Sequence, residues 1–137
     1  MTPQPMTTDL WMLVATGLWS LCIPQIYAVG RLITPGGFTW AFGNRDAPFA
    51  MPAWAQRALR AHANLTENLG LFAILILVAH VTGRANGLTA EGAEIFFIAR
   101  VAHTLFYSTG ITFLYLRTLA YTAGIAGEIL ILVQLFQ

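Results

Sequence analysis

The residues of this chain best suited to chemistry are arginine, acidic, amide and aromatic side chains that recur at helical spacing within very hydrophobic sequence. Between residues 57 and 68 they are separated by three, four, three and one positions. At about 100° per residue, they share one face of a helix. Two similar sets follow further along the chain. In order, the three sets are Arg57, Arg60, Asn64, Glu67 and Asn68; Arg100, His103 and Tyr107; and Arg117, Tyr121, Gly124 and Glu128.

These side chains suit a small ligand that carries both anionic and cationic groups. Guanidinium groups bind carboxylates through paired hydrogen bonds, a glutamate binds an ammonium group, and amides bind peptide groups. Glutathione carries this combination of groups. It also carries a thiol, whose ordinary pKa of about 8.5 must fall before the thiol attacks an electrophile near neutral pH. An adjacent arginine would favour this by stabilising the thiolate.

Several of these residues also have a purely structural interpretation. Arg57 lies near the start of a helix. For this residue alone, a side chain that extends toward the membrane surface is a better explanation than a role in ligand binding. Glu67 is two turns or more inside its helix, where an ion pair with Arg100 on another helix is the competing explanation. His62 lies away from the polar face, and a single histidine there is more often a packing residue. The histidines at positions 62, 80 and 103 do not have the spacing of a metal site on one helix.

The elements that position these residues are predicted to be transmembrane helices. The chain has 137 residues, of which 57% are hydrophobic and 9% are charged, against roughly 25% charged residues in soluble domains. A soluble chain of this length could not bury so much apolar surface. The net charge of +1 provides no basic surface for nucleic acid. The single cysteine excludes intramolecular disulfides and cysteine-rich zinc sites.

We expect one domain over residues 1–137, with helices over about 9–32, 53–82, 90–114 and 116–136. The stretch 10–30 has no charged residue and is long enough to span the ~30 Å hydrocarbon layer. Glycine and proline residues over 33–52 predict one long loop, and Thr89 is the expected N-cap of the third helix. The predicted fold class is all-α, an antiparallel four-helix bundle of the integral-membrane type with both termini on the same side.

The arginines are unevenly distributed between the two ends of this expected bundle. Four of them flank or occupy the first connection, whereas the second connection carries Arg84 alone and is followed by two glutamates. Because arginine-rich connections stay in the cytoplasm, we expect the first and third connections inside and both termini outside. No lysine or arginine precedes the first helix, so this helix is expected to remain in the mature protein.

Residues 57–68 resemble the signature R-x-x-R-A-x-x-N-x-x-E of the MAPEG family, the membrane-associated proteins in eicosanoid and glutathione metabolism. Residues 100–107 resemble the third-helix motif R-V-A-H-T-x-x-Y of the prostaglandin E synthase branch, and residues 117–122 resemble its fourth-helix motif R-x-x-x-Y-T. Residues 43–46 are similar to a loop of bacterial members. The resemblances cover most of the chain and follow one another in the family's order.

The resemblance implies a homotrimer of four-helix subunits that binds glutathione at the cytoplasmic end, between neighbouring subunits. It implies that Arg117 stabilises the thiolate and that Tyr121 lies close to it. His62 and Arg31 would contact the ligand of a neighbouring subunit. The residues that would hold the tripeptide itself are Arg60, Asn64, Glu67, His103 and Tyr107.

Three positions depart from the family pattern. Gly70 stands where many members have a proline just after the motif, and Ala63 replaces an arginine of the prostaglandin E synthase. Arg117 lies one residue farther from Tyr107 than in that enzyme. The lost arginine argues against the specialised prostaglandin reaction, whereas retention of Arg117 and Tyr121 favours an enzyme.

The function implied is a glutathione transferase or peroxidase that acts on lipophilic electrophiles or lipid hydroperoxides drawn from membrane lipids. Its expected location is the bacterial inner membrane, with the site facing the cytoplasm. The alternative is a non-catalytic lipid-binding or accessory subunit of the same fold. A small transporter is a weaker alternative, because the helices are not interrupted by glycine and proline in paired halves.

Overall fold

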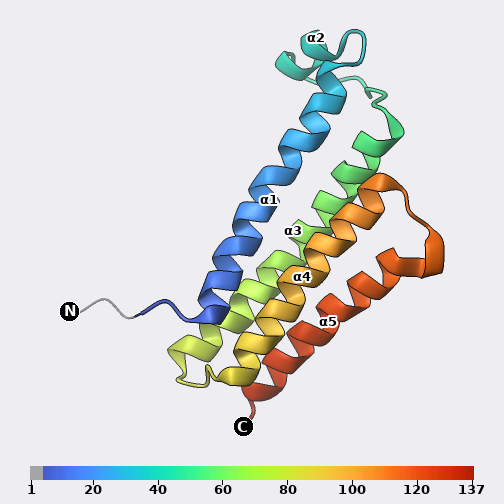
Figure 1. Ribbon diagram of the computed structural model, residues 1–137. Coiled ribbons are helices and arrows are strands. Elements are labelled where there is room, and N and C mark those ends of the chain that lie inside the picture. The colour runs from blue at the N-terminus through green and yellow to red at the C-terminus, as the bar shows by residue number, and fades with distance from the viewer. Residues whose placement is uncertain (1–4) are drawn as a thin grey trace.

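The computed structural model describes residues 5–137. Within this range, four long helices run antiparallel to one another (Figure 1). They are α1 (Thr8–Leu32), α3 (Ala53–Val81), α4 (Gly87–Thr109) and α5 (Leu116–Gln134). The C-terminus and the start of α1 lie at the same end of the bundle (Figure 1). The predicted all-α bundle is therefore confirmed.

The first connection is not entirely the loop that its glycines and prolines predict. It contains a short helix, α2 (Gly37–Phe42), which begins after Gly36. Gly36 has a φ of 78°, in the left-handed region that favours glycine. Gly37 lies so close to the Arg31 carbonyl that a Cβ atom would overlap it. This close approach folds α2 back onto the end of α1.

Helix α4 begins and ends earlier than predicted, and the prediction that Thr89 is its N-cap is wrong. Asn86 is the cap, since its Oδ1 accepts hydrogen bonds from the backbone N–H groups of Leu88 (2.8 Å) and Thr89 (3.2 Å). The Thr89 hydroxyl accepts a hydrogen bond from the Asn86 N–H (2.9 Å), which completes a capping box. The helix ends at Gly110, whose φ of 79° is typical of a helix C-terminus.

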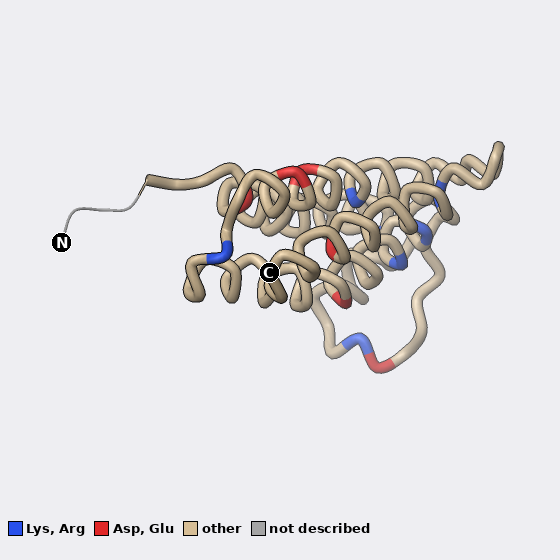
Figure 2. The backbone as a smooth tube through the Cα atoms, turned by 90° about the horizontal axis from the view of Figure 1, so that it is seen from below, with Lys and Arg blue, Asp and Glu red and all other residues tan. Residues whose placement is uncertain are grey.

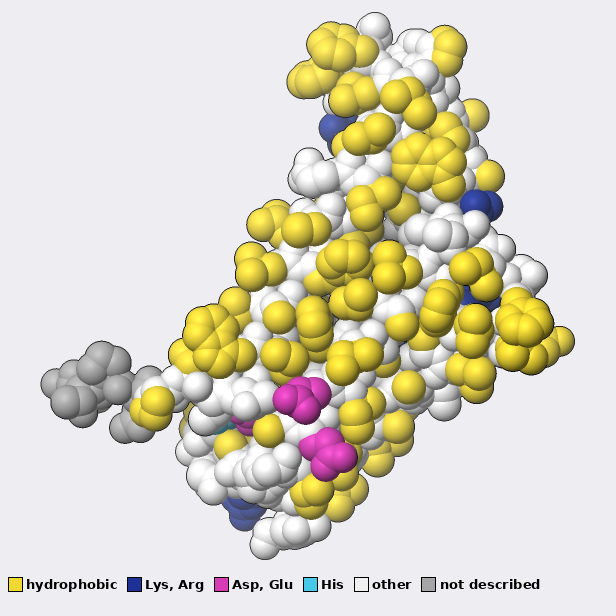
Figure 3. Space-filling view, in the orientation of Figure 1, with side chains coloured by type: hydrophobic (Ala, Val, Ile, Leu, Met, Phe, Trp, Pro, Cys, Tyr) yellow, Lys and Arg dark blue, Asp and Glu magenta, His cyan; other side chains and the backbone are white. Residues whose placement is uncertain are grey.

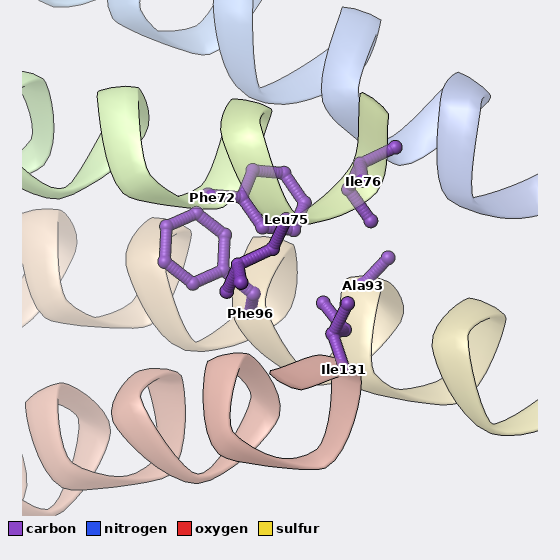
Figure 4. Close-up of a cluster of buried hydrophobic side chains, with 6 residues drawn as sticks. All are labelled: Phe72, Leu75, Ile76, Ala93, Phe96 and Ile131. Atoms are coloured by element: carbon purple, nitrogen blue, oxygen red, sulfur yellow. The ribbon is translucent and has the colours of Figure 1, made fainter. Parts of the chain in front are cut away.

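Helix α4 packs against α1, α3 and α5, whereas α1 and α5 do not contact each other. Phe72 of α3 and Phe96 of α4 stack with ring centroids 4.0 Å apart at the centre of the main apolar core. The other buried members of this core are Leu75, Ile76, Ala93 and Ile131 (Figure 4). Side chains from α3, α4 and α5 therefore meet in one cluster around α4.

Helices α4 and α5 approach closely where Gly92 faces Gly127. A Cβ atom on Gly92 would lie 2.7 Å from the Gly127 carbonyl oxygen, and one on Gly127 would lie 2.6 Å from the Gly92 carbonyl oxygen. Small residues at such crossings let two membrane helices bring their backbones together. The two glycines thereby fix the register of α5 along α4.

The composition of the helices shows an integral membrane protein. In the part of the chain that the structure describes, α1, α3 and the segment Phe113–Gln134 are long and apolar enough to cross a membrane. Hydrophobic side chains cover much of the face shown in Figure 3, and the acidic side chains on it lie toward the end with the chain termini. Helix α4 has 23 residues, a sufficient length, but carries Glu91, Glu94 and Arg100.

Candidate functional site

The side chain of Tyr107 on α4 lies between two arginines that come from different helices. Arg60 on α3 donates a hydrogen bond from Nε to the Tyr107 hydroxyl (3.1 Å), and its Cζ lies 5.9 Å from the ring centroid. Arg117 on α5 lies over the same ring, with Cζ 4.6 Å from the centroid. Both arginines are exposed. Their guanidinium groups are therefore held in place by one aromatic ring and remain accessible to an anionic ligand.

His103 lies one turn before Tyr107 on α4 and is nearly buried, with 6% of its surface exposed. The centroid of its ring is 5.7 Å from that of Tyr107 and 6.1 Å from that of Tyr121 on α5. The three rings form an aromatic cluster that Arg60 and Arg117 border. The structure thus brings together five of the predicted site residues from α3, α4 and α5.

Arg100 is buried deeper in the bundle, with 1% of its surface exposed. Its Nη1 donates a hydrogen bond to Oδ1 of Asn64 (3.2 Å), and its Cζ lies 5.0 Å from the centroid of Tyr121. Gly124 makes room for the guanidinium group, since a Cβ atom there would lie 3.1 Å from Nε of Arg100. Arg100 therefore connects Asn64, a predicted ligand, to the aromatic cluster.

The acidic side chain that interacts electrostatically with Arg100 is Glu128 of α5, without a direct salt bridge between them in residues 5–137. Glu128 is 4% exposed. Its Oε1 has no hydrogen-bond partner among residues 5–137, and neither do Nε and Nη2 of Arg100. Glu67 is exposed and forms no ion pair within the described chain. The competing interpretation, in which Glu67 is the ion-pair partner of Arg100, is therefore wrong.

His62 and Arg31 lie apart from the aromatic cluster. His62 faces α1, with Nε2 3.2 Å from Oγ of Ser20 and Nδ1 3.2 Å from the hydroxyl of Tyr27. Arg31, at the end of α1, lies over the same tyrosine, with Cζ 4.8 Å from the ring centroid. Within one chain, these two predicted ligands therefore contact Tyr27 and do not join Arg60 and Arg117.

A cavity of about 370 Å³ lies beside Tyr107 and Arg117, and Arg57 forms part of its wall. The Nε of Arg57 donates a hydrogen bond to the carbonyl of Ser108 (3.2 Å) in the last turn of α4, where carbonyls have no partner within the helix. Arg57 therefore does more than extend toward the membrane surface, because it contacts α4 and lines the cavity. No sequence signal identified its partner, because that bond depends on how α3 packs against α4.

Most arginines lie at the end of the bundle where the first connection joins α1 to α3, and their backbone positions are marked in Figure 2. At the opposite end, Asp9 is 2% exposed, and its Oδ2 lies 3.0 Å from Nε2 of His80. Asp9 also accepts hydrogen bonds from the Thr89 hydroxyl (3.1 Å) and the Leu10 N–H (3.0 Å). This carboxylate joins the ends of α1, α3 and α4. Residues 5–137 contain no cluster of three or more side chains able to hold a metal ion.

Comparison with known proteins adds independent support for the resemblance in the helix motifs. No curated protein sequence matches the chain significantly. The family model described as the MAPEG family matches residues 10–137, which include every residue discussed above except Asp9. This match extends over nearly the whole chain, so the protein belongs to the MAPEG family.

Proposed function

We propose that this protein is an integral-membrane glutathione transferase or peroxidase. It would activate the glutathione thiol for attack on lipophilic electrophiles or lipid hydroperoxides that enter from the bilayer. The observation that carries this proposal is the pair of exposed arginines, Arg60 and Arg117, which both contact Tyr107. Membership of a family concerned with glutathione metabolism supports glutathione as their ligand.

Exposed side chains of α3 would bind charged groups of glutathione. Arg60, at the exposed edge of the cluster, would bind one of the two carboxylates of glutathione. Its ammonium group requires an anion, and the carboxylate of Glu67 is exposed and makes no ion pair among residues 5–137. Asn64 uses its Oδ1 to hold Arg100, and its Nδ2 is the group that would donate to a peptide carbonyl of the ligand.

Arg117 is the residue that we assign to the thiol. A guanidinium group beside the sulfur favours the thiolate, so the proton leaves to solvent and the sulfur becomes nucleophilic. In conjugation, the sulfur forms a bond to an electrophilic carbon while the leaving group departs with the bonding electron pair. Tyr121 lies one turn after Arg117 on α5, where its hydroxyl would lie close to the sulfur.

We further propose that the protein is a homotrimer in a bacterial inner membrane. The separation of His62 and Arg31 from the Tyr107 cluster supports this assembly, because the resemblance to the family gives these two residues a contact with the ligand of a neighbouring subunit. The concentration of arginines at the Tyr107 end of the bundle supports a cytoplasmic position of the site.

Titration of the detergent-solubilised protein with glutathione tests the proposal. Ultraviolet absorbance of the thiolate should rise as glutathione binds, and it should not rise with S-methylglutathione, which lacks the thiol proton. Glutathione binding without thiolate formation would favour a non-catalytic accessory subunit. Absence of any binding would refute the assignment of glutathione.

A further inference from the structure

An apolar groove of about 430 Å³ lies between α4 and α5, and no residue of α3 lines it. Small residues from both helices form much of its lining, so the groove has room for a flexible hydrocarbon chain. These small residues are Ala99, Ala102, Ala120 and Ala123. The helices α4 and α5 come close together at Gly92 and Gly127. The groove is therefore a shallow depression along the two helices and does not pass between them.

The groove lies next to the cavity that Arg57 and Arg117 line. Phe106 contributes to the lining of both, and Leu116 of the groove directly precedes Arg117 of the cavity. The lining of the cavity includes both arginines and no acidic residue. The combined site is therefore cationic where α4 ends and α5 begins, and apolar along the two helices.

The dimensions of the groove correspond to one leaflet of a bilayer. Its lining on α4 extends from Ile95 to Phe106, a distance of about 16 Å at 1.5 Å per residue. The hydrocarbon layer is about 30 Å thick, so one leaflet contributes about half of that length. A hydrocarbon chain that begins near Phe106 would therefore end near the middle of the membrane.

We propose that an anionic phospholipid binds here, with its phosphate in the cavity and one acyl chain in the groove. The lipid would come from the leaflet at the arginine-rich end of the bundle, where Arg57 and Arg117 line the cavity. A choline headgroup would place a second cation close to Arg57 and Arg117, so a lipid with net negative charge is preferred. This binding goes beyond the proposed function, although the phosphate would share Arg117 with the proposed glutathione site. The test is therefore carried out without glutathione.

Native mass spectrometry of the purified full-length protein tests the proposal. After delipidation in detergent, the protein is offered equal amounts of phosphatidylglycerol and phosphatidylcholine with identical acyl chains. Phosphatidylglycerol should be retained preferentially. Arg57→Gln should reduce its retention about fivefold, the effect of one arginine at a lipid surface. Arg84→Gln, at the opposite end of the bundle, is the matched control and should leave retention unchanged.

A second variant fills the groove without touching the arginines. Ala123 is exposed in the groove, so Ala123→Trp should abolish retention of phosphatidylglycerol while the melting temperature stays the same. Val14→Trp, at an exposed position of α1, should have no effect. The comparison of Ala123→Trp with Val14→Trp still tests the proposal if Arg57→Gln destabilises the last turn of α4, which Arg57 contacts.

Three outcomes would overturn the proposal. Equal retention of the two lipids would show that the arginines do not select a negative charge. Complete displacement of the lipid by inorganic phosphate would show that the cavity alone binds and that the groove contributes nothing. A change in the number of chains per particle on Ala123→Trp would show that a second copy of the protein, and not a lipid, occupies the groove.

Discussion

Replacement of Glu67 by glutamine should separate ligand binding from stability in this protein. The substitution keeps the size of the side chain and removes only its negative charge. Glu67 is exposed and forms no ion pair within residues 5–137, so its charge stabilises none of the buried cations. We therefore expect the free energy of unfolding to change by less than about 0.5 kcal/mol.

The expected loss of glutathione affinity is much larger. If Glu67 binds the ammonium group, the variant loses a charge-assisted hydrogen bond, which contributes about 1.5–3 kcal/mol. Since each 1.4 kcal/mol corresponds to about a factor of ten, the dissociation constant should rise roughly 10- to 150-fold. Isothermal titration calorimetry measures this constant, and thermal denaturation of the same sample without ligand measures stability.

Glu128→Gln is the matched control, because Glu128 is 4% exposed and faces Arg100. Removing its charge weakens the electrostatic compensation of a buried cation, so the free energy of unfolding should fall by at least about 1 kcal/mol. Glu67→Gln should therefore lose affinity for glutathione and keep its stability, whereas Glu128→Gln should lose stability. Unchanged glutathione affinity in Glu67→Gln would refute the role of Glu67, and an equal loss of stability in both variants would refute the assignment of Glu128 as the counterion.

Three further predictions follow from other parts of the structure. Arg117→Gln should lower the rate of thiol conjugation more than the affinity for glutathione in steady-state and binding assays, since its charge acts on the thiolate; equal losses would argue against this role. Asp9→Ala should lower the free energy of unfolding by about 1–3 kcal/mol in thermal denaturation, because it removes a hydrogen-bond partner of Thr89 and His80, whereas Asp46→Ala, in the exposed first connection, should change it by less than about 0.5 kcal/mol. Chemical cross-linking in mild detergent should yield trimers, and a monomer that still binds glutathione would contradict a shared site.

Helical periodicity was sufficient to predict which polar residues share a face. Arg60, Tyr107 and Arg117 belong to three separate motifs, and the structure places them in contact. Each motif lies on one helix, and a spacing of three or four residues fixes the direction of a side chain around its helix. The part of the site that depends on helix faces was therefore accessible from the sequence.

The pairing between faces was not accessible in this way. Two glutamates, Glu67 and Glu128, lie on polar faces, and only the packing of the helices selects Glu128 as the counterion of Arg100. That choice follows from the space left at Gly124, which a sequence pattern does not reveal. Periodicity gives the angular position of a residue on its own helix, but not its height relative to a neighbouring helix.

The choice between neighbouring capping residues has a similar origin. Asn86 and Thr89 are both favoured at helix N-caps, so local preference alone does not decide between them. In the structure, Asn86 caps α4, and the Thr89 hydroxyl serves both the capping box and the carboxylate of Asp9. The capping box at the start of α4 is thus accompanied by a contact between Thr89 and Asp9, which is distant in the sequence.

The burial of Arg100 in α4 has a consequence for the synthesis of the protein. An arginine near the centre of a helix opposes insertion by about 2.5–3.5 kcal/mol, and α4 is not among the helices of residues 5–137 that meet the combined criteria of length, hydropathy and charge for crossing a membrane. Its counterion, Glu128, lies on the next helix and is translated later. We therefore expect α4 to become stable in the bilayer only when α5 has emerged from the ribosome and the two enter as a hairpin. A chain truncated after Thr109 should leave α4 outside the membrane, while α1 and α3 are still inserted.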